Sequence, residues 1–388
     1  MALPRYSPRE MIEKLVGFDT TSRFSNLELI TFIEDYLSAH GIAHERIESA
    51  DGRKTNLYAT LGDLDMPGGI VLSGHTDVVP VDDQEWSSNP FQVREHDGKL
   101  YGRGTCDMKS FVAVVLALIP NFSGRVLKRP VHLALSYDEE VGCLGVRDML
   151  AHIAKVKPKP AFAIIGEPSD MKVVNAHKAI RGFETVITGR EAHSSATHFG
   201  LNAVMIAAEL IHFLNQMDEE MRARGDASGR FMPPFTSVHV GVVEGGTAQN
   251  IIPRHCRIVW EYRCLPGSDE DEIIRRFNVF AQEKLSLMRQ IAPEADIVTH
   301  MKAAVPALAP QPGSEAEHFA KLIAQRNEAE AVSYGTEAGL FQNAGIPAIV
   351  CGPGNILQAH RPDEFVALSQ IEACETFMRR FIEQVCEA

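Results

Sequence analysis

The sequence predicts an α/β protein in which a mostly parallel sheet, covered by helices, carries a second and smaller inserted domain. Between residues 56 and 170, short apolar runs alternate with helical stretches, which is typical of a parallel sheet covered on both faces. A segment with a different order of elements interrupts this pattern near residue 180, and a last strand and helix follow it. A length of 388 residues suits two such domains.

The larger domain, residues 1–179 and 305–388, is built from these apolar runs. Residues 1–18 mix charged and apolar side chains at helical spacing, which predicts a first amphipathic helix rather than a signal peptide. Strands are expected at 69–74, 131–136, 161–165 and 346–351, and helices from 110, at 145–155 and at 369–385.

The inserted domain, residues 180–304, has its own order of elements. Residues 182–188, 237–243, 257–263 and 295–301 alternate as strands do, and 202–215 and 269–287 have helical spacing. The resulting order is strand, helix, strand, strand, helix, strand. This is the ferredoxin-like βαββαβ unit.

Composition excludes several classes of function. Hydrophobic residues make up 45% of the chain and charged residues 23%, as in ordinary globular proteins. A net charge of -13 repels phosphate backbones, so we expect no nucleic-acid partner. The longest strongly apolar run, residues 111–119, is about half of what a bilayer requires, so we expect no membrane partner. Seven cysteines without a Cys-x-x-Cys fit neither a disulfide framework nor a thiolate zinc site, and favour the cytoplasm.

Acidic residues and histidines follow the predicted strands of the larger domain. Open α/β sheets bind ligands beyond the carboxyl ends of their strands. The residues found there are His75 with Asp77, Asp138 with Glu139 and Glu140, Glu167 and, further on, His360; Asp107 lies in the loop that enters the helix at 110. We expect these side chains to converge in one crevice.

Six carboxylates and two imidazoles at one mouth would repel one another without cations, which favours a metal site. Oxygen and nitrogen ligands without thiolate suit zinc, cobalt or manganese. Asp77 is well placed to fix the tautomer of a metal-bound His75. Taken singly, a His-x-Asp pair is more often a surface hydrogen bond and a Glu-Glu doublet a solvated loop. Their shared position at strand ends favours the metal site.

Competing motifs are absent or incomplete. Cys106 has no nucleophile motif around it, and we interpret it as a packed small residue. The run Gly102-x-Gly104-x-x-Asp107 lacks the third glycine of a dinucleotide fingerprint, and neither a P-loop, a His-Glu-x-x-His nor a Gly-x-Ser-x-Gly elbow is present. Nucleotide-binding and serine-hydrolase functions are therefore not expected.

Several segments in order resemble the motifs of the M20 family of dinuclear metallopeptidases. The resemblance covers nearly the whole chain and rests on residues 73–80, 102–109, 138–140, 165–169, 189–195, 250–253 and 351–364. It implies a zinc-peptidase-like catalytic domain, an inserted dimerisation (lid) domain and a homodimer. It also implies two divalent ions per subunit, zinc in the first place and cobalt as an alternative.

The resemblance assigns roles to individual residues. His75 and Glu167 would hold one ion, Glu140 and His360 the other, and Asp107 would bridge both, with Glu139 as general base. His193, by resemblance, would stabilise the oxyanion from the partner subunit, although the sequence alone makes it a surface residue at a helix start. Arg263 would bind the substrate carboxylate, with a structural salt bridge as an equal alternative. Asn250, Thr336 and Glu337 complete the expected substrate-binding set. Glu337 would face a substrate ammonium or cap the following helix.

The implied reaction is amide hydrolysis of a small N-acylated amino acid. N2-acetyl-L-ornithine, cleaved to ornithine and acetate in arginine biosynthesis, is the expected substrate. Succinyl-diaminopimelate, other acylated amino acids and dipeptides are alternatives, because the scissile bond is the same and only the pocket differs. A non-catalytic amino-acid binding protein on the same scaffold is an alternative of another class. The presence of Glu139 favours catalysis.

Overall fold

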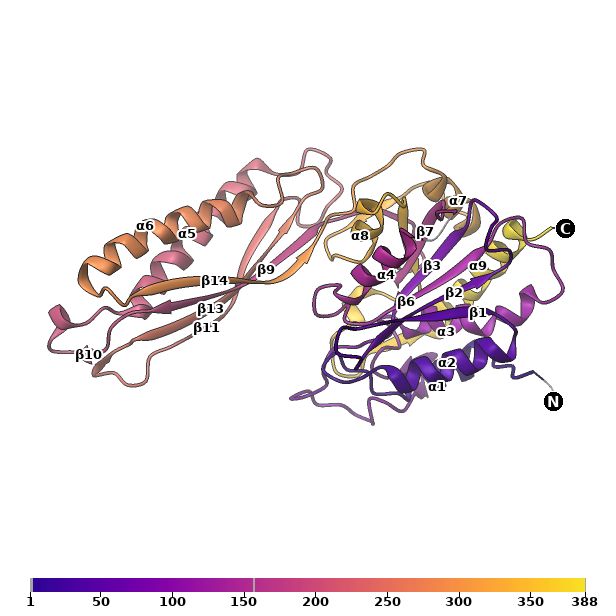
Figure 1. Ribbon diagram of the computed structural model, residues 1–388, viewed down its shortest axis with the longest axis horizontal. Helices are drawn as coiled ribbons and strands as arrows, with labels where there is room; N and C mark the ends of the chain where they lie inside the picture. The colour runs from indigo at the N-terminus through magenta and orange to yellow at the C-terminus, as the bar shows by residue number, and fades with distance from the viewer. Residues whose placement is uncertain (1–2, 156–157, 388) are drawn as a thin grey trace. The chain divides into compact units, whose positions relative to one another are not determined.

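A computed structural model describes residues 3–155 and 158–387 of the chain. It divides the chain into two compact units (Figure 1). The larger unit comprises Met1–Ala176, Pro310–Glu330 and Thr336–Ala388, and the smaller comprises His177–Ala309 and Ala331–Gly335. The smaller unit thus begins three residues before the predicted boundary at 180 and also takes in a short later segment.

The larger unit is built on an eight-stranded mixed sheet. Its strand order is β1-β2-β6-β3-β7-β16-β8-β15. The central strands β6, β3, β7 and β16 run parallel, whereas β1, β2 and β8 pair antiparallel with their neighbours. The bounds are β1 Ala43–Glu48, β2 Thr55–Leu61, β3 Ile70–His75, β6 Val131–Ser136, β7 Phe162–Pro168, β8 Val174–His177, β15 Glu330–Val332 and β16 Ala348–Gly352.

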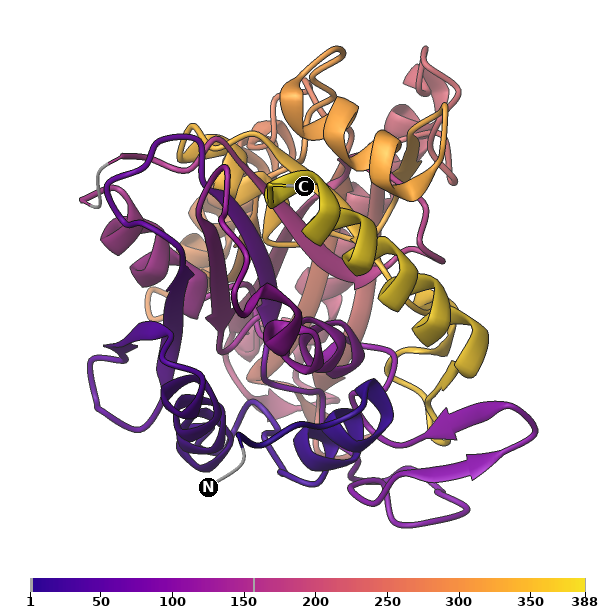
Figure 2. The ribbon, with the colours of Figure 1, turned by 90° about the vertical axis from the view of Figure 1, so that its right-hand side faces the viewer.

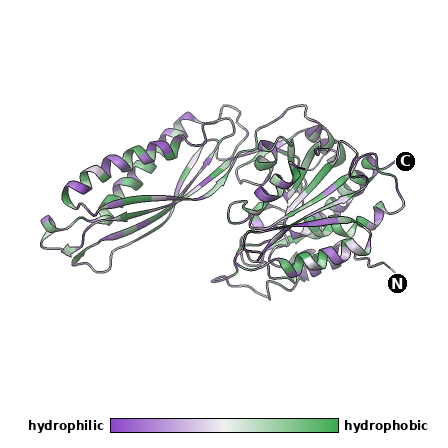
Figure 3. Cartoon of the chain, viewed as in Figure 1, coloured by the Kyte–Doolittle hydropathy of each residue, from purple (hydrophilic) through white to green (hydrophobic). Residues whose placement is uncertain are grey.

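The parallel strands are buried along their whole length, as expected where helices cover both faces of a sheet. Edge strand β1 instead consists of exposed and half-buried residues, and Figure 3 shows it as more hydrophilic than the inner strands. The central strands therefore form the buried part of the sheet. That centre is also where the predicted site residues follow the strands.

Seven helices belong to the larger unit as described. They are α1 Pro8–Val16, α2 Leu27–Ala39, α3 Lys109–Ala117, α4 Gly145–Ile153, α7 Glu315–Ala324, α8 Ala338–Asn343 and α9 Leu368–Val385. Helices α3 and α7 both contact α9, which runs across one face of the sheet (Figure 2), and α4 contacts α8. A small separate sheet pairs β17 Phe365–Ala367, β5 Lys99–Tyr101 and β4 Arg94–His96.

The first helix is shorter than the sequence pattern predicts. It begins at Pro8 because Ser7 and Glu10 form a reciprocal capping box in front of it. Residues 1–2 of the predicted helix lie outside the described residues. No helix in the part of the chain that the structure describes combines the length and apolar character needed to cross a membrane.

The smaller unit has a four-stranded antiparallel sheet in the order β11-β13-β9-β14. Its elements are β9 Ala179–Thr188, α5 Ala203–Arg224, β11 Ser237–Gly245, β13 His255–Cys264, α6 Glu272–Ile291 and β14 Asp296–Val305, with a short pair of β10 Ala192–His193 and β12 Ile251–Ile252. Helices α5 and α6 carry hydrophobic and hydrophilic residues along their length (Figure 3). Their apolar residues pack on a core around Trp260 and Phe277. This is the predicted βαββαβ order.

Candidate metal centre

Two of the predicted metal ligands, His75 and Glu167, lie at the ends of central parallel strands. His75 is the last residue of β3 and is 1% exposed, and Glu167 lies near the end of the neighbouring β7 and is 4% exposed. Glu139 and Glu140 follow β6, the strand on the other side of β3. Because the carboxyl ends of parallel strands meet at one edge of a sheet, these side chains converge.

Asp107 lies between the two histidines of the cluster. Its Oδ1 is 3.0 Å from His75 Nε2, and its Oδ2 is 3.3 Å from His360 Nε2. His75 Nε2 is also 3.7 Å from Glu167 Oε1, and His360 Nε2 is 3.0 Å from Glu140 Oε2. The two oxygens of one carboxylate therefore face two separate imidazole–glutamate pairs.

The cluster has the donors and spacing that divalent ions require. Potential ligand atoms of His75, Glu139 and Glu167 lie within 4.8 Å of one another, and so do those of His75, Asp107 and Glu140. Oxygen and imidazole donors without thiolate are a ligand set for zinc and its neighbours. The residues present thus fit metal ions. Glu139 lies within the first set, although the sequence analysis assigns it the role of base.

The pKa shifts within the cluster also indicate a site for cations. Burial, with repulsion from Glu140 and Asp107, raises the pKa of Glu139 to about 8 despite attraction to His75. Burial and the Asp107 charge raise the pKa of Glu140 to about 7. Burial opposes protonation of His360, but hydrogen bonds to Asp107 and Glu140 raise its pKa to about 10. So many buried carboxylates need compensating positive charge, which bound cations supply.

The Asp77 carboxylate contacts both the His75 ring and the backbone of Glu139 and Glu140. Its Oδ1 is 3.5 Å from His75 Nδ1, which also lies 2.9 Å from the Asp77 carbonyl oxygen. The Asp77 carboxylate accepts backbone N–H bonds from Glu139 at 3.1 Å and Glu140 at 3.3 Å, and the hydroxyl of Ser22 at 2.7 Å. One buried carboxylate therefore orients the His75 ring and fixes the start of the Glu139–Glu140 loop.

The predicted residues of the smaller unit lie near its surface. His193 is exposed, pairs with Ile251 across β10 and β12, and has its Nδ1 2.8 Å from the Ser195 hydroxyl. Asn250 is also exposed, and its carbonyl accepts the Ser194 N–H. Arg263 is the last residue but one of β13, where its Nε donates to Glu261 at 3.0 Å. His193 and Asn250 thus lie close together. Arg263 forms an ion pair with Glu261, which is the alternative role expected for it.

Thr336 and Glu337 are buried in the larger unit, 0% and 1% exposed. The Thr336 hydroxyl accepts the Ala338 N–H, and the Glu337 carboxylate accepts the hydroxyls of Ser73 and Ser136. Glu337 precedes α8 but makes no capping hydrogen bond with its side chain. The helix cap expected of Glu337 is therefore not formed. Pairing of Glu337 with a substrate ammonium, and substrate binding by Thr336, stay predictions.

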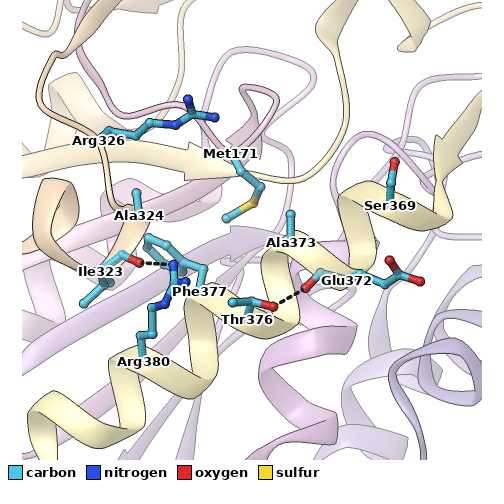
Figure 4. A pocket seen from close by; sticks show the side chains of 10 residues that line it. All are labelled: Met171, Ile323, Ala324, Arg326, Ser369, Glu372, Ala373, Thr376, Phe377 and Arg380. Carbon is cyan, nitrogen blue, oxygen red and sulfur yellow. Dashed lines mark hydrogen bonds between the residues drawn. The ribbon is translucent and has the colours of Figure 1, made fainter.

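Two further features, the Cys106 thiol and a groove beside α9, are distinct from the candidate metal ligands. Cys106 is 1% exposed, and burial raises the pKa of its thiol, as suits a packed residue rather than a nucleophile. A separate groove of about 350 Å³ lies along α9 between Arg326, Glu372 and Arg380 (Figure 4). None of the predicted site residues lines this groove.

Sequence reasoning missed two residues beneath the Asp107 loop. Arg103 and Glu364 form an ion pair in which each side chain is 1% exposed. Glu364 lies in a motif used for the family resemblance, four residues after His360, and that position was the only signal for it. Its burial depends on two distant segments meeting, which no local pattern reveals.

Comparison with known proteins places the chain in a family. Residues 71–384 match peptidase family M20/M25/M40. The chain belongs to this family. Acetylornithine deacetylase of Pasteurella multocida (strain Pm70) is 35% identical over 93% of this chain and 92% of its own length. Acetylornithine deacetylase of Myxococcus xanthus is 32% identical over 97% of both chains.

Solved structures share the M20 fold at lower identity. An M20 family metallo-carboxypeptidase, Sso-CP2 from Sulfolobus solfataricus, has a TM-score of 0.78 at 17% identity and covers 97% of this chain and 99% of its own. Human carnosine dipeptidase 1 has a TM-score of 0.72 at 16% identity, covering 97% of both chains. Family and relatives together make this M20 protein a metal-dependent hydrolase.

Proposed function

We propose that the protein hydrolyses N2-acetyl-L-ornithine to L-ornithine and acetate, a step of arginine biosynthesis. The observation that carries the proposal is the cluster in which the buried Asp107 faces two imidazole–glutamate pairs, in a chain whose relatives named acetylornithine deacetylase match it over more than 90% of its length. Amide hydrolysis is the chemistry that these residues suit.

In the proposed metal arrangement, His75 and Glu167 would hold one divalent ion, Glu140 and His360 would hold the other, and Asp107 would serve both. Zinc is the proposed metal, with cobalt as a substitute. When bound, such ions activate water and polarise the scissile carbonyl. The opposed oxygens of Asp107, aimed at His75 and His360, support this assignment.

Glu139 is the proposed general base. Burial and nearby carboxylates raise its pKa in the protein without cations, and bound cations would lower that pKa again, leaving a carboxylate that can accept a proton. Glu139 takes a proton from the attacking water and delivers it to the leaving nitrogen, because one group can serve as base and then as acid. Asp77 keeps the Glu139 loop in place through its bond to the Glu139 N–H.

The smaller unit is proposed to dimerise and to supply substrate contacts. His193 stabilises the oxyanion from the partner subunit, a role that needs a hydrogen-bond donor beside the developing charge. Arg263 and Asn250 bind the substrate, with the Arg263 guanidinium on the carboxylate. The exposure of His193 and Asn250 supports this proposal, because both side chains are accessible to a second surface.

A cytoplasmic location accompanies this function. All seven cysteines are free thiols and are buried in the described structure, which fits a reducing compartment.

The substrate is tested by assaying purified, zinc-loaded protein with acetylornithine, succinyl-diaminopimelate and a set of dipeptides. We expect kcat/KM for acetylornithine to exceed the other values by at least tenfold. A higher kcat/KM for succinyl-diaminopimelate or for a dipeptide would assign the protein to that substrate. Binding of acetylornithine without turnover would favour the non-catalytic alternative.

A further inference from the structure

A buried carboxylate holds the loop that presents Asp107. Oε1 of Glu364 accepts backbone N–H bonds from Gly104 at 3.0 Å, from Cys106 at 2.8 Å and from Asp107 itself at 3.1 Å. The Glu364 carbonyl oxygen also accepts the Gly102 N–H at 2.9 Å. Backbone N–H groups along the Asp107 loop thus all donate to Glu364. The orientation of the Asp107 carboxylate therefore depends on Glu364.

The charge of this carboxylate is balanced by Arg103. Nη1 of Arg103 donates to Glu364 Oε2 at 2.6 Å, and Nη2 donates to Gln84 Oε1 at 2.6 Å. The Arg103 guanidinium also lies over the Trp86 ring, 5.0 Å from its centroid. A buried guanidinium of this kind requires good geometry with every partner, because an unpaired buried charge is costly.

The same group of residues reaches His360. Nε2 of Gln84 donates to the His360 carbonyl oxygen at 3.0 Å, and Arg103 Nη1 lies 3.4 Å from the Arg361 carbonyl oxygen. His360 lies on a loop, its φ is +62°, and its side chain is 53% exposed. Neither a strand nor tight packing fixes this ring. The ring itself contacts Asp107 and Glu140, and the backbone that presents it is held by Gln84 and Arg103.

The other half of the cluster is held differently. His75 and Glu167 are part of the paired central strands β3 and β7, which are buried throughout. Their positions follow from the sheet itself. The contacts of Gln84, Arg103 and Glu364 end on Asp107 and on the His360 loop.

We propose that Gln84, Arg103 and Glu364 are positioning residues that set the geometry of the His360 side of the metal cluster and thereby the affinity of the ion bound there. This inference rests on the proposed two-metal function. Loss of a hydrogen-bond partner behind metal ligands lowers metal affinity 10–100-fold. Gln84 contacts the His360 loop and not Asp107, so its loss should fall on one ion of the two. Glu364 also holds Asp107, the proposed bridge, so its loss should reach both ions.

The test is a zinc titration of metal-free protein in competition with a chromophoric chelator. Wild-type protein is expected to bind two ions in two phases, and His360→Ala identifies the phase that belongs to the His360 side. Gln84→Ala should raise the Kd of that phase by about 10–100-fold and leave the other within about twofold. Glu364→Gln, which removes the charge facing Arg103 and weakens the hold on the Asp107 loop, should shift the same phase at least as far and raise the Kd of the other phase as well.

Gln84→Ala also removes a partner of the buried Arg103 and should lower the unfolding midpoint of the metal-free protein, so the unequal change of the two binding phases carries the test. Gln92→Ala, an exposed glutamine in the same stretch between β3 and β4, is the matched control and should leave both phases unchanged. Equal weakening of both ions in Gln84→Ala, or no weakening, overturns the inference alone. Wild-type protein that binds a single ion overturns the two-metal function and the inference with it.

Discussion

The two units carry their candidate functional residues in opposite ways. In the larger unit, His75, Asp107 and Glu167 are 1–6% exposed and have partners within the unit. In the smaller unit, His193 and Asn250 are exposed. Buried polar groups must find their partners locally, whereas exposed ones stay available to another surface. The difference teaches that the larger unit brings its candidate cluster together by itself, whereas the exposed candidates of the smaller unit are proposed to act on a second surface.

The strongest test of this comparison is removal of metal. Dialysis against a chelator should abolish hydrolysis, because the proposed reaction needs cations beside Asp107, and zinc or cobalt should restore it. Calorimetry of the same samples should show a lower unfolding midpoint for the larger unit alone, since a ligand stabilises the unit that binds it. Undiminished turnover in protein shown by elemental analysis to be metal-free would contradict the mechanism.

Substitution of the proposed base gives the next largest effect. Glu139→Gln should lower kcat by roughly 10²–10⁴, the usual contribution of a general base. Because Glu139 also lies near His75 and Glu167, the metal content of the variant must be measured. Two bound ions with lost turnover support the role of base. Loss of one ion would make Glu139 a ligand, and normal turnover would assign the proton transfer to another group.

The smaller unit is tested by mixing two inactive variants. His193→Ala should lose about 10²–10³ in kcat, the typical effect of one oxyanion donor. If His193 acts in the partner's site, an equal mixture with Glu139→Gln forms mixed dimers with one intact site, which restores roughly a quarter of wild-type activity. No recovery, after subunit exchange has been demonstrated by mass spectrometry, would place His193 in its own subunit's site or outside catalysis.

The sequence predicts residues at strand ends but not contacts between distant segments of the chain. His75 and Glu167 were predictable because they end apolar runs, and strand ends define the binding edge of a parallel sheet. The pairing of Arg103 with Glu364 was not, because it depends on contacts between segments about 260 residues apart. For the same reason the sequence pattern missed the antiparallel edge strand β1 and the small sheet that joins β17 to β5. Local periodicity predicts elements, whereas pairing partners come from tertiary contacts.

The smallest expected effect compares a buried histidine in each unit. Burial lowers the pKa of His132 in the larger unit to about 4. It also lowers to about 4 the pKa of His177, which ends β8 and is the first residue of the smaller unit, so both are neutral in the folded protein at pH 7. An unfolded histidine, with a pKa near 6.5, takes up a proton sooner as the pH falls. Each residue therefore contributes full stability above about pH 6.5 and loses it as the pH falls toward 4, about 2 kcal/mol by pH 5.

Calorimetry of wild type, His132→Gln and His177→Gln from pH 7.5 to pH 5 measures this loss. Each substitution should weaken the acid sensitivity of its own unit's transition, so that the variant approaches the wild-type midpoint at low pH. His96→Gln, at a histidine whose side chain is 60% exposed, is the control and should follow wild type throughout. A constant difference between variant and wild type across this range would mean that protonation of the buried ring does not limit stability. A shift of both transitions by one substitution would mean that the two units unfold together rather than separately.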